Sequence, residues 1–407
     1  MPRVSWKLNL AMLWFSQLVI MAGYQALTPF ISLFIKNDMG VTSPGELAVA
    51  VASYNFATTA GYAIFNPVWG TLADRFGVKP MLLRGTFLTG IFFPMMAYTK
   101  SIWLLILLRF ISAACAGTTA ASQTMVARNT PDEHQGFAQG VLTTAIWGGA
   151  MLGNVIGGLL IHYFNYKVAF WVCGSFYALG GISILFTRDT NLVKVKAPAS
   201  HIKQHGMTAL LPKFSTAVWI MLSLFLLMGI VRNLEAPYIA LRVEEMTDKE
   251  TAALWTGIIS AAVCAAAIIS GVVSGALVDR YPVGKILIPV ILFSSLALAM
   301  QGFADNLWVF GFGRVLLYTA AGGLQPILQK NLSSVTPQRK RGKVFGFASS
   351  ASAVGGMLSA VFGGLAMTAC GISGVFYISA IAFAATLPVM LRGISRALQP
   401  FRFHRAR

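Results

Sequence analysis

The sequence has 407 residues, of which 56% are hydrophobic and only 11% are charged, against about 25% charged in a typical soluble domain. The mean hydropathy is +0.70, and the formal net charge at pH 7 is +18. These values exclude an ordinary soluble domain. Apolar stretches of about 20 residues recur along the whole chain, which is typical of a polytopic α-helical membrane protein.

Hydropathy divides the chain into twelve predicted membrane spans. They lie near residues 8–35, 47–71, 81–99, 102–127, 137–162, 167–187, 215–241, 252–278, 286–304, 307–333, 344–368 and 373–392. The first span is too long for a signal-peptide core and has no small-residue cleavage site, so we expect it to stay in the protein. Residues 188–214 are basic and polar, and we interpret them as a cytoplasmic linker between two six-span bundles, residues 1–187 and 215–407.

The basic residues predict the orientation of the spans. If both termini are cytoplasmic, five basic residues lie outside: Lys36, Lys100, Lys167, Arg242 and Lys249. Three arginines, Arg109, Arg232 and Arg314, fall within spans, which leaves 23 of the 31 lysines and arginines on the cytoplasmic side. The positive-inside rule therefore favours cytoplasmic termini, and the basic C-terminal tail would face anionic lipid. Because the charges are dispersed over many loops, we expect no nucleic-acid partner.

Internal repetition relates the two halves. "GTLADRF" at 70–76 returns as "GALVDRY" at 275–281, and "LRFISAACAG" at 108–117 returns as "GRVLLYTAAG" at 313–322, both with an offset of 205. "LGNVIGGLL" at 152–160 returns as "LSAVFGGLA" at 358–366, and Pro131 returns as Pro337, both with an offset of 206. The chain is therefore a duplicated six-span unit.

Three of these segments carry a family resemblance. "GTLADRFGVKP" at 70–80 matches the loop signature G-x-L-x-D-R-x-G-[RK]-[RK] over residues 70–79 except at Val78, and Pro80 follows directly where the pattern does not expect it. Arg109 matches a span-4 signature, and "GAMLGNVIGG" at 149–158 matches a span-5 antiporter signature in which Asn154 replaces a proline. The sequence thus resembles the major facilitator superfamily, and most of all its twelve-span drug:proton antiporter branch. The resemblance implies an all-α membrane protein with the major facilitator fold, in which twelve transmembrane helices form two pseudo-symmetric six-helix bundles.

The loop signature implies a conformational latch between the two bundles. Glycines at the loop permit a tight turn, and an aspartate there can face the positive N-terminus of a neighbouring helix. The residues that we assign to this latch are Gly70, Asp74, Arg75, Gly77, Lys79, Asp279 and Arg280. The alternative is a solvated basic loop without a latching role.

Polar residues at helical spacing mark the faces that would line a central cavity. They include Asn55, Thr58, Thr59, Tyr62 and Asn66 of span 2, and Arg109, Ser112, Thr119 and Gln123 of span 4. The predicted substrate-binding residues are Tyr24, Gln25, Thr28, Asn55, Thr59, Tyr62, Arg109, Arg232, Glu235, Tyr238, Arg314, Tyr318 and Gln325. Individually, such residues are as often simple helix–helix contacts. We interpret the glycine-rich faces at Gly148, Gly149, Gly153 and Gly157, and at Gly355, Gly356, Gly363 and Gly364, as close packing between helices.

Glu235 is the acidic residue that we place inside a span, in "RNLEAPY" of span 7. A charge at that depth costs roughly 2.5–3.5 kcal/mol on insertion scales, so it is a functional candidate. Aligning Pro237 with Pro29 leaves the other half without this carboxylate. Glu235 resembles the acidic residue of span 1 or span 7 that couples protons in the drug antiporters. We therefore assign Glu235, with Arg232 and Arg109, to proton coupling. The alternative is a fixed ion pair between Glu235 and Arg232.

The predicted function is therefore proton-coupled export of small amphipathic compounds by alternating access, from a cell inner membrane. A second hypothesis keeps the fold but carries an anionic metabolite, such as a carboxylate or a siderophore, because three arginines outnumber one acid. No nucleophile, base or metal motif of an intramembrane enzyme occurs, so we expect no enzymatic activity, cofactor or metal. The expected partners are a small-molecule substrate, protons and membrane lipid, with a monomer as the family expectation.

Overall fold

The computed structural model describes residues 6–187, 214–281, 283–336 and 341–402. These residues contain helices and no strand, which confirms the all-α prediction. The first half holds α1 (Trp6–Gln25), η1 (Thr28–Phe30), α2 (Ile31–Leu33), η2 (Phe34–Asp38), α3 (Pro44–Phe76), α4 (Val78–Met96), α5 (Ile102–Cys115), α6 (Thr118–Asn129), η3 (Asp132–His134), α7 (Gln135–Tyr163) and α8 (Tyr166–Leu185). The second half holds α9 (Thr216–Arg232), η5 (Ala236–Tyr238), α10 (Ile239–Met246), α11 (Ala252–Arg280), α12 (Val283–Phe303), α13 (Leu307–Ala321), α14 (Leu324–Val335) and α15 (Arg341–Arg402).

Joined across short breaks, these helices reproduce the predicted spans. The long α15 covers the last two spans. They meet at Gly371, whose non-helical φ of 70° and ψ of −174° mark the boundary between them. Nine helical stretches among the described residues are long and apolar enough to cross a membrane, and one of them, Val344–Arg396, includes both spans of α15. The linker predicted at 188–214 lies outside the described residues except for Phe214, so the bundle boundaries stay a prediction.

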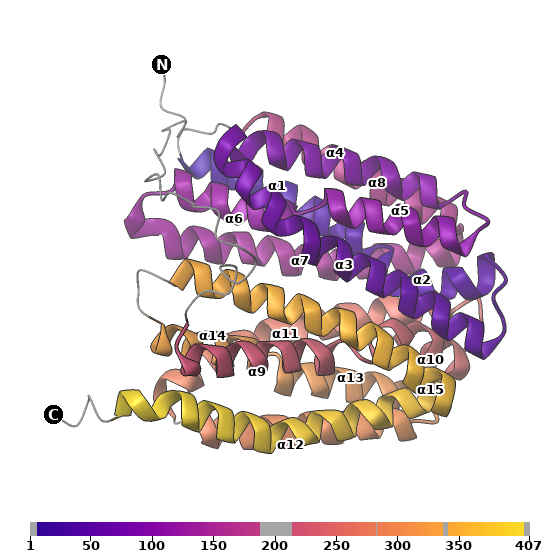
Figure 1. The fold of residues 1–407 in the computed structure, drawn as a ribbon. Coiled ribbons are helices and arrows are strands. Elements are labelled where there is room, and N and C mark those ends of the chain that lie inside the picture. Colours follow the sequence, from indigo (N-terminus) through magenta and orange to yellow (C-terminus); the bar gives the residue numbers. More distant parts are fainter. Residues whose placement is uncertain (1–5, 188–213, 282, 337–340, 403–407) are drawn as a thin grey trace, which may run out of the picture.

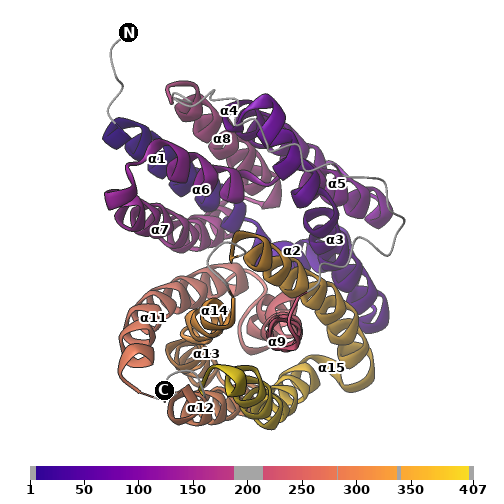
Figure 2. The ribbon, with the colours of Figure 1, turned by 60° about the vertical axis from the view of Figure 1, so that its left-hand side comes forward.

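The two halves form two bundles that lie side by side (Figure 1), with both termini at the same end of the molecule. We call this the terminal end, and the opposite one the distal end. Viewed from another side, α7 lies beside α11 and α3 beside α15 (Figure 2), and both pairs are in contact. These two seams join the bundles.

Four spans are broken near their middle, in related pairs. Span 1 breaks at Pro29 and span 7 at Pro237, each within a short 3-10 turn, because proline lacks the N–H that a continuing helix needs. Span 4 breaks at Gly117, which has φ 109°, and span 10 breaks at Gly322 and Gly323 between α13 and α14. Gly117 and Gly322 stand 205 residues apart, so the duplication extends to the helix breaks.

The tight contacts between the bundles gather in the distal half. Lys36 pairs with Oε2 of Glu244, and the Asn37 amide donates to Oε1 of the same carboxylate at 2.7 Å. One large apolar core includes residues of both halves, among them Leu33 and Leu241. A second apolar core, from Ala217 to Ile394, draws only on the second half. The distal end is therefore closed by packing and by one shared carboxylate.

Asn154, which replaces the motif proline, lies in the seam between α7 and α11. It is 2% exposed, and its amide donates to Cys264 Sγ of α11 at 3.5 Å. The backbone is also close there, because a Cβ on Gly257 would overlap the Asn154 carbonyl oxygen. Without proline, α7 runs unbroken from Gln135 to Tyr163 and contributes a polar contact between the bundles.

The glycine-rich face of α7 packs on α1, as predicted. A Cβ added at Gly149, Gly153 or Gly157 would overlap the carbonyl oxygens of Leu18, Ala22 and Ala26, respectively. These glycines are four residues apart, so they follow one stripe of the helix. The backbones of α1 and α7 can approach this closely only because that stripe has no side chains.

Gly153→Ala is expected to lower the free energy of unfolding by about 1–3 kcal/mol, the usual range for overpacking. Gly140 on the same helix offers a matched control, since a Cβ there would meet nothing within 4 Å. Gly140→Ala should instead stabilise the protein by about 0.5–1 kcal/mol, because alanine is the better helix former. Thermal unfolding of both variants in detergent tests the pair, and a shift of equal sign would contradict the packing assignment.

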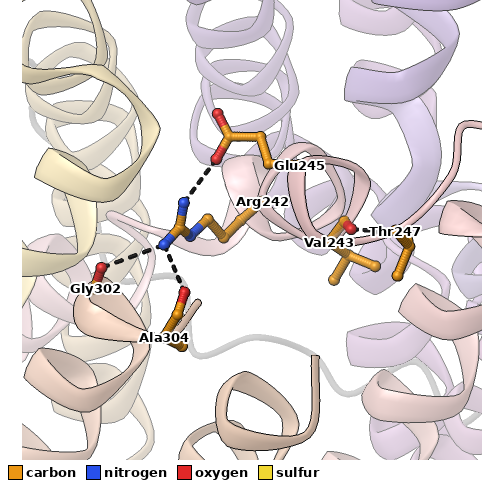
Figure 3. A network of polar contacts seen from close by, with 6 residues as sticks. All are labelled: Arg242, Val243, Glu245, Thr247, Gly302 and Ala304. Atoms are coloured by element: carbon orange, nitrogen blue, oxygen red, sulfur yellow. Dashed lines mark hydrogen bonds and ion pairs between the residues drawn. The ribbon is translucent and has the colours of Figure 1, made fainter. Parts of the chain in front are cut away.

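Two arginines bind backbone carbonyls that helix ends leave free. Arg242 of α10 donates to the carbonyl oxygens of Gly302 at 3.3 Å and Ala304 at 2.8 Å, and it pairs with Glu245 at 2.8 Å (Figure 3). Arg84, one of the 23 basic residues assigned to the cytoplasmic side, lies within α4, 3.2 Å above the Trp69 ring. Its guanidinium donates to the Ala116 carbonyl at 3.4 Å, directly at the break of span 4.

Candidate transport site

Glu235 and Arg314 form a buried ion pair in the second bundle. Arg314 Nη1 of α13 lies 3.0 Å from Glu235 Oε1, and these residues are 3% and 2% exposed. The same nitrogen donates to Gln301 Oε1 of α12 at 3.4 Å. Glu235 therefore lies at the break of span 7, where α12 and α13 meet the turn before Pro237.

The partner of Glu235 differs from the one considered from sequence. Arg232 stands three residues before Glu235, a spacing that would bring the two side chains together on a continuous helix. However, α9 ends at Arg232, and Asn233 has φ −111° and ψ 3°. The break turns Glu235 toward Arg314, so a fixed Glu235–Arg232 pair does not form. Among the described residues, Arg232 donates to Gln325 Oε1 at 3.4 Å.

A polar cavity of about 230 Å³ opens beside Arg232. It is lined by Met228, Gly229, Arg232, Asn233, Tyr318, Gln325 and Ser352. Three of the predicted substrate-binding residues, Arg232, Tyr318 and Gln325, thus come together here from α9, α13 and α14. Asn233 is exposed, so the cavity is open to its surroundings.

A second, narrow space adjoins Glu235 of the ion pair and shares two lining residues with this cavity. It has about 10 Å³ and is lined by Val231, Arg232, Glu235, Leu298, Leu317, Tyr318, Ala321 and Phe383. Such a volume holds about one water molecule. Because Arg232 and Tyr318 line both spaces, the Glu235 carboxylate lies one residue layer from the polar cavity.

Arg109 occupies the equivalent place in the first bundle but has neutral partners. Its Nε donates to the Thr58 hydroxyl at 2.7 Å, and its Nη2 donates to the Tyr24 hydroxyl at 3.0 Å. The guanidinium carbon lies 5.3–5.6 Å from the ring centres of Tyr24, Tyr54 and Phe93. Arg109 is 2% exposed, and no acidic partner occurs among the described residues.

The second cavity, of about 360 Å³, lies in the first bundle. Its lining residues are Ile20, Met21, Tyr24, Tyr62, Asn66, Ala116, Gly117, Thr118, Thr119, Ala120, Gln123 and Tyr177. It thus includes the predicted substrate residues Tyr24 and Tyr62, together with Asn66, Thr119 and Gln123 of the predicted polar stripes. Arg109 lies behind Tyr24 rather than in the cavity wall.

Seven predicted substrate residues do not line these cavities: Gln25, Thr28, Asn55, Thr59, Arg109, Tyr238 and Arg314. The hydroxyls of Thr28 and Thr59 and the amide of Asn55 donate to carbonyls one turn earlier in their own chain segment. Tyr238 is 1% exposed, and its hydroxyl has no partner among the described residues. The contacts of Thr28, Asn55 and Thr59 are those of the packing alternative that helical spacing could not exclude, and the substrate role of these residues stays a prediction.

The latch residues are only partly described. Gly77 ends α3 with φ 93°, the left-handed conformation that glycine permits. Lys79 donates to the carbonyls of Leu185 at 2.7 Å and Thr187 at 2.6 Å, so it caps α8 of its own bundle rather than joining the two bundles. The side chains of the remaining latch candidates, Gly70, Asp74, Arg75, Asp279 and Arg280, lie outside the described part of the structure.

The residues of these sites that were not predicted include Asn233 and Ser352 of the polar cavity, as well as Gln301 and Tyr177. Gln301 Oε1 accepts a hydrogen bond from the Arg314 guanidinium, and Tyr177 lines the cavity of the first bundle. Gln301 is a lone amide in the apolar run "SSLALAMQGF", and a buried amide in such a run is itself a signal of a polar contact. Tyr177 gives no comparable signal, because tyrosine is common in apolar helices.

Comparison with known proteins gives one consistent result. The profile of the Major Facilitator Superfamily matches residues 13–300 and 244–402. The multi-drug resistance efflux pump PmrA of Streptococcus pneumoniae is 27% identical over 393 residues, covering 94% of this chain and 95% of the relative. The multidrug resistance protein MdtG of Escherichia fergusonii is 28% identical over 402 residues, covering 98% and 97%.

A solved structure extends the match to the fold. The crystal structure of the nucleoside transporter NupG superimposes with a TM-score of 0.77 at 13% identity, covering 97% of this chain and all of the other. The two bundles of six helices and the matched profile, which extends over nearly the whole chain, agree with the resemblance drawn from the loop and span signatures. This membrane protein belongs to the major facilitator superfamily, a family of transporters.

Proposed function

We propose that this protein is a proton-driven exporter of small amphipathic compounds that works by alternating access as a monomeric carrier and not as an enzyme. The observation that carries the proposal is the buried Glu235–Arg314 pair, one water-sized space from an open polar cavity. Of two relatives that match nearly the whole chain, PmrA is named a multi-drug resistance efflux pump and MdtG a multidrug resistance protein, which supports export over uptake.

The ion pair provides a chemical means of coupling. A buried carboxylate is stable as an anion only while a cation faces it, so proton uptake by Glu235 releases Arg314. Arg314 is then free to turn toward Gln301 or the cavity, and the packing of α12 and α13 around span 7 changes. A substrate that binds the polar cavity contacts Arg232 and Tyr318, which also line the narrow space beside Glu235. Its binding would therefore change the surroundings of the same ion pair. Proton and substrate would therefore favour opposite arrangements of the second bundle.

The bundles supply the alternation of access. In the described residues, tight contacts between them lie toward the distal end, at Lys36, Glu244 and the α7–α11 seam. We infer that the structure represents the state closed at the distal end, with the cavities accessible from the terminal end. The charge distribution supports cytoplasmic termini, and the bacterial relatives support location in the inner, cytoplasmic membrane.

Flux into proteoliposomes of defined orientation tests this function. An imposed pH gradient should drive accumulation of ethidium or of 1-naphthylacetate against its concentration gradient, with proton movement in the opposite direction. A protonophore should abolish the accumulation, and protein-free liposomes provide the baseline. Transport of neither probe above that baseline, or transport unaffected by the protonophore, would contradict proton-driven export.

A further inference from the structure

The polar cavity beside Arg232 has an unbalanced positive charge. Arg232 is the cationic residue in its lining, and its side-chain partner among the described residues is the neutral Gln325 amide at 3.4 Å. The carboxylate nearest in sequence, Glu235, is already bound by Arg314. A cation in a membrane interior without an anion is unfavourable, so the cavity would gain stability from a negatively charged occupant.

The other side chains of the cavity are suited to the same occupant. Asn233 and Gln325 carry amide N–H donors, and Tyr318 and Ser352 carry hydroxyls. The Asn233 amide uses one N–H on the Gly229 carbonyl at 2.9 Å, which fixes the side chain and leaves a second N–H. A guanidinium presents paired N–H groups that match the two oxygens of a carboxylate.

The size and position of the cavity indicate which part of a compound it takes. A volume of about 230 Å³ is below the range of about 300–1,000 Å³ usual for sites that enclose a whole drug-sized ligand. A Cβ on Gly356 would lie 3.4 Å from Thr59 Cγ2 of the first bundle and 3.9 Å from Asn233 Nδ2. The cavity therefore adjoins the interface between the bundles, where the apolar part of a compound can lie.

We propose that this cavity binds the carboxylate group of an amphipathic compound, with Arg232 as the residue that selects for negative charge. The inference rests on the proposed function, because it takes the compound in the cavity to be the transported one. Arg109 does not offer an equivalent site, since Tyr24 separates it from the cavity of the first bundle.

Equilibrium binding to the full chain in phosphatidylcholine nanodiscs tests the proposal. The probes are 1-naphthylacetate, the neutral isostere 1-naphthylacetamide and the cation 1-naphthylmethylammonium. The wild type should bind the acid at least about tenfold more tightly than the amide, which corresponds to about 1.4 kcal/mol, and should bind the ammonium most weakly. Equal or tighter binding of the amide or the ammonium would overturn the proposal.

Variants assign the selectivity to Arg232. Arg232→Gln should weaken binding of the acid about tenfold and leave binding of the amide unchanged, whereas Arg232→Lys should retain part of the preference because it keeps the charge but not the paired donors. Lys249→Gln, which removes an exposed charge outside the cavity, should leave all affinities unchanged. An acid preference that persists in Arg232→Gln would overturn the assignment.

A change of lipid and a comparison with flux complete the test. If the acid binds in phosphatidylcholine but is displaced when phosphatidylglycerol replaces that lipid, the occupant is a lipid headgroup and the proposal is wrong. Because the binding measurements use no gradient, they are independent of proton coupling. Acid selectivity without proton-driven flux would contradict the exporter alone, and proton-driven flux without acid selectivity would contradict this inference alone.

Discussion

Glu235→Gln is expected to reduce pH-gradient-driven accumulation of either probe to the level of protein-free liposomes, while equilibrium binding of 1-naphthylacetate stays close to that of the wild type. Glutamine keeps the size of the side chain and an oxygen that can accept from Arg314, but it cannot take up and release a proton at the working pH. Flux driven by an imposed pH gradient, measured beside binding in nanodiscs, checks both halves of this expectation.

Glu245→Gln is the matched control for that experiment. Glu245 lies in α10 on the same span, but it is exposed and its ion pair with Arg242 faces the surface. This variant should retain coupled transport, because an exposed ion pair contributes only about 0–1 kcal/mol. Proton-coupled accumulation that continues in Glu235→Gln would remove Glu235 from the mechanism.

Arg314→Gln should have the largest effect on stability. It leaves the Glu235 carboxylate 2% exposed without a cation, and breaking a buried ion pair in this way costs about 3–5 kcal/mol. The double variant Glu235→Gln/Arg314→Gln should recover most of the loss, because two neutral amides of similar size replace the pair. Thermal and chemical unfolding in detergent, for the two single variants and the double variant, measure the coupling energy.

The pH dependence of the same variants gives a second readout. In Arg314→Gln the unfavourable species is the unpaired anion, so lowering the pH should restore stability as Glu235 takes up a proton. The double variant has no such group and should lack this pH-dependent component. If Arg314→Gln and the double variant are equally unstable at every pH, Arg314 acts through packing alone and not through the charge of Glu235.

Hydropathy and repetition were sufficient to predict the general architecture. A span needs about 20 apolar residues whatever its neighbours are, so the order of the helices could be read from local composition. The packing of Gly149, Gly153 and Gly157 on α1 also follows from the sequence, because their four-residue spacing defines one helical face. The matched family profile confirms the resemblance drawn from the loop and span signatures.

The site was less predictable because its contacts depend on breaks within the spans. Treating span 7 as one helix placed Arg232 against Glu235, whereas the break after Arg232 directs the carboxylate to Arg314, 79 residues away. Helical spacing likewise could not separate Tyr62, which lines a cavity, from Asn55, whose amide returns to its own helix. Such distinctions depend on the rotation of each helix within its bundle, which one sequence does not encode locally.

The short helix α10 has a mechanical consequence. Glu235 lies one 3-10 turn before it and Glu244 lies within it, nine residues later. One carboxylate contacts Arg314 inside the second bundle, and the other holds Lys36 and Asn37 of the first. The segment between them therefore links the ion pair inside the second bundle to the contact between the bundles at the distal end. If Glu235 takes up a proton as we propose, a shift of its end of the segment would be transmitted to Glu244 and would weaken the contact with Lys36 and Asn37.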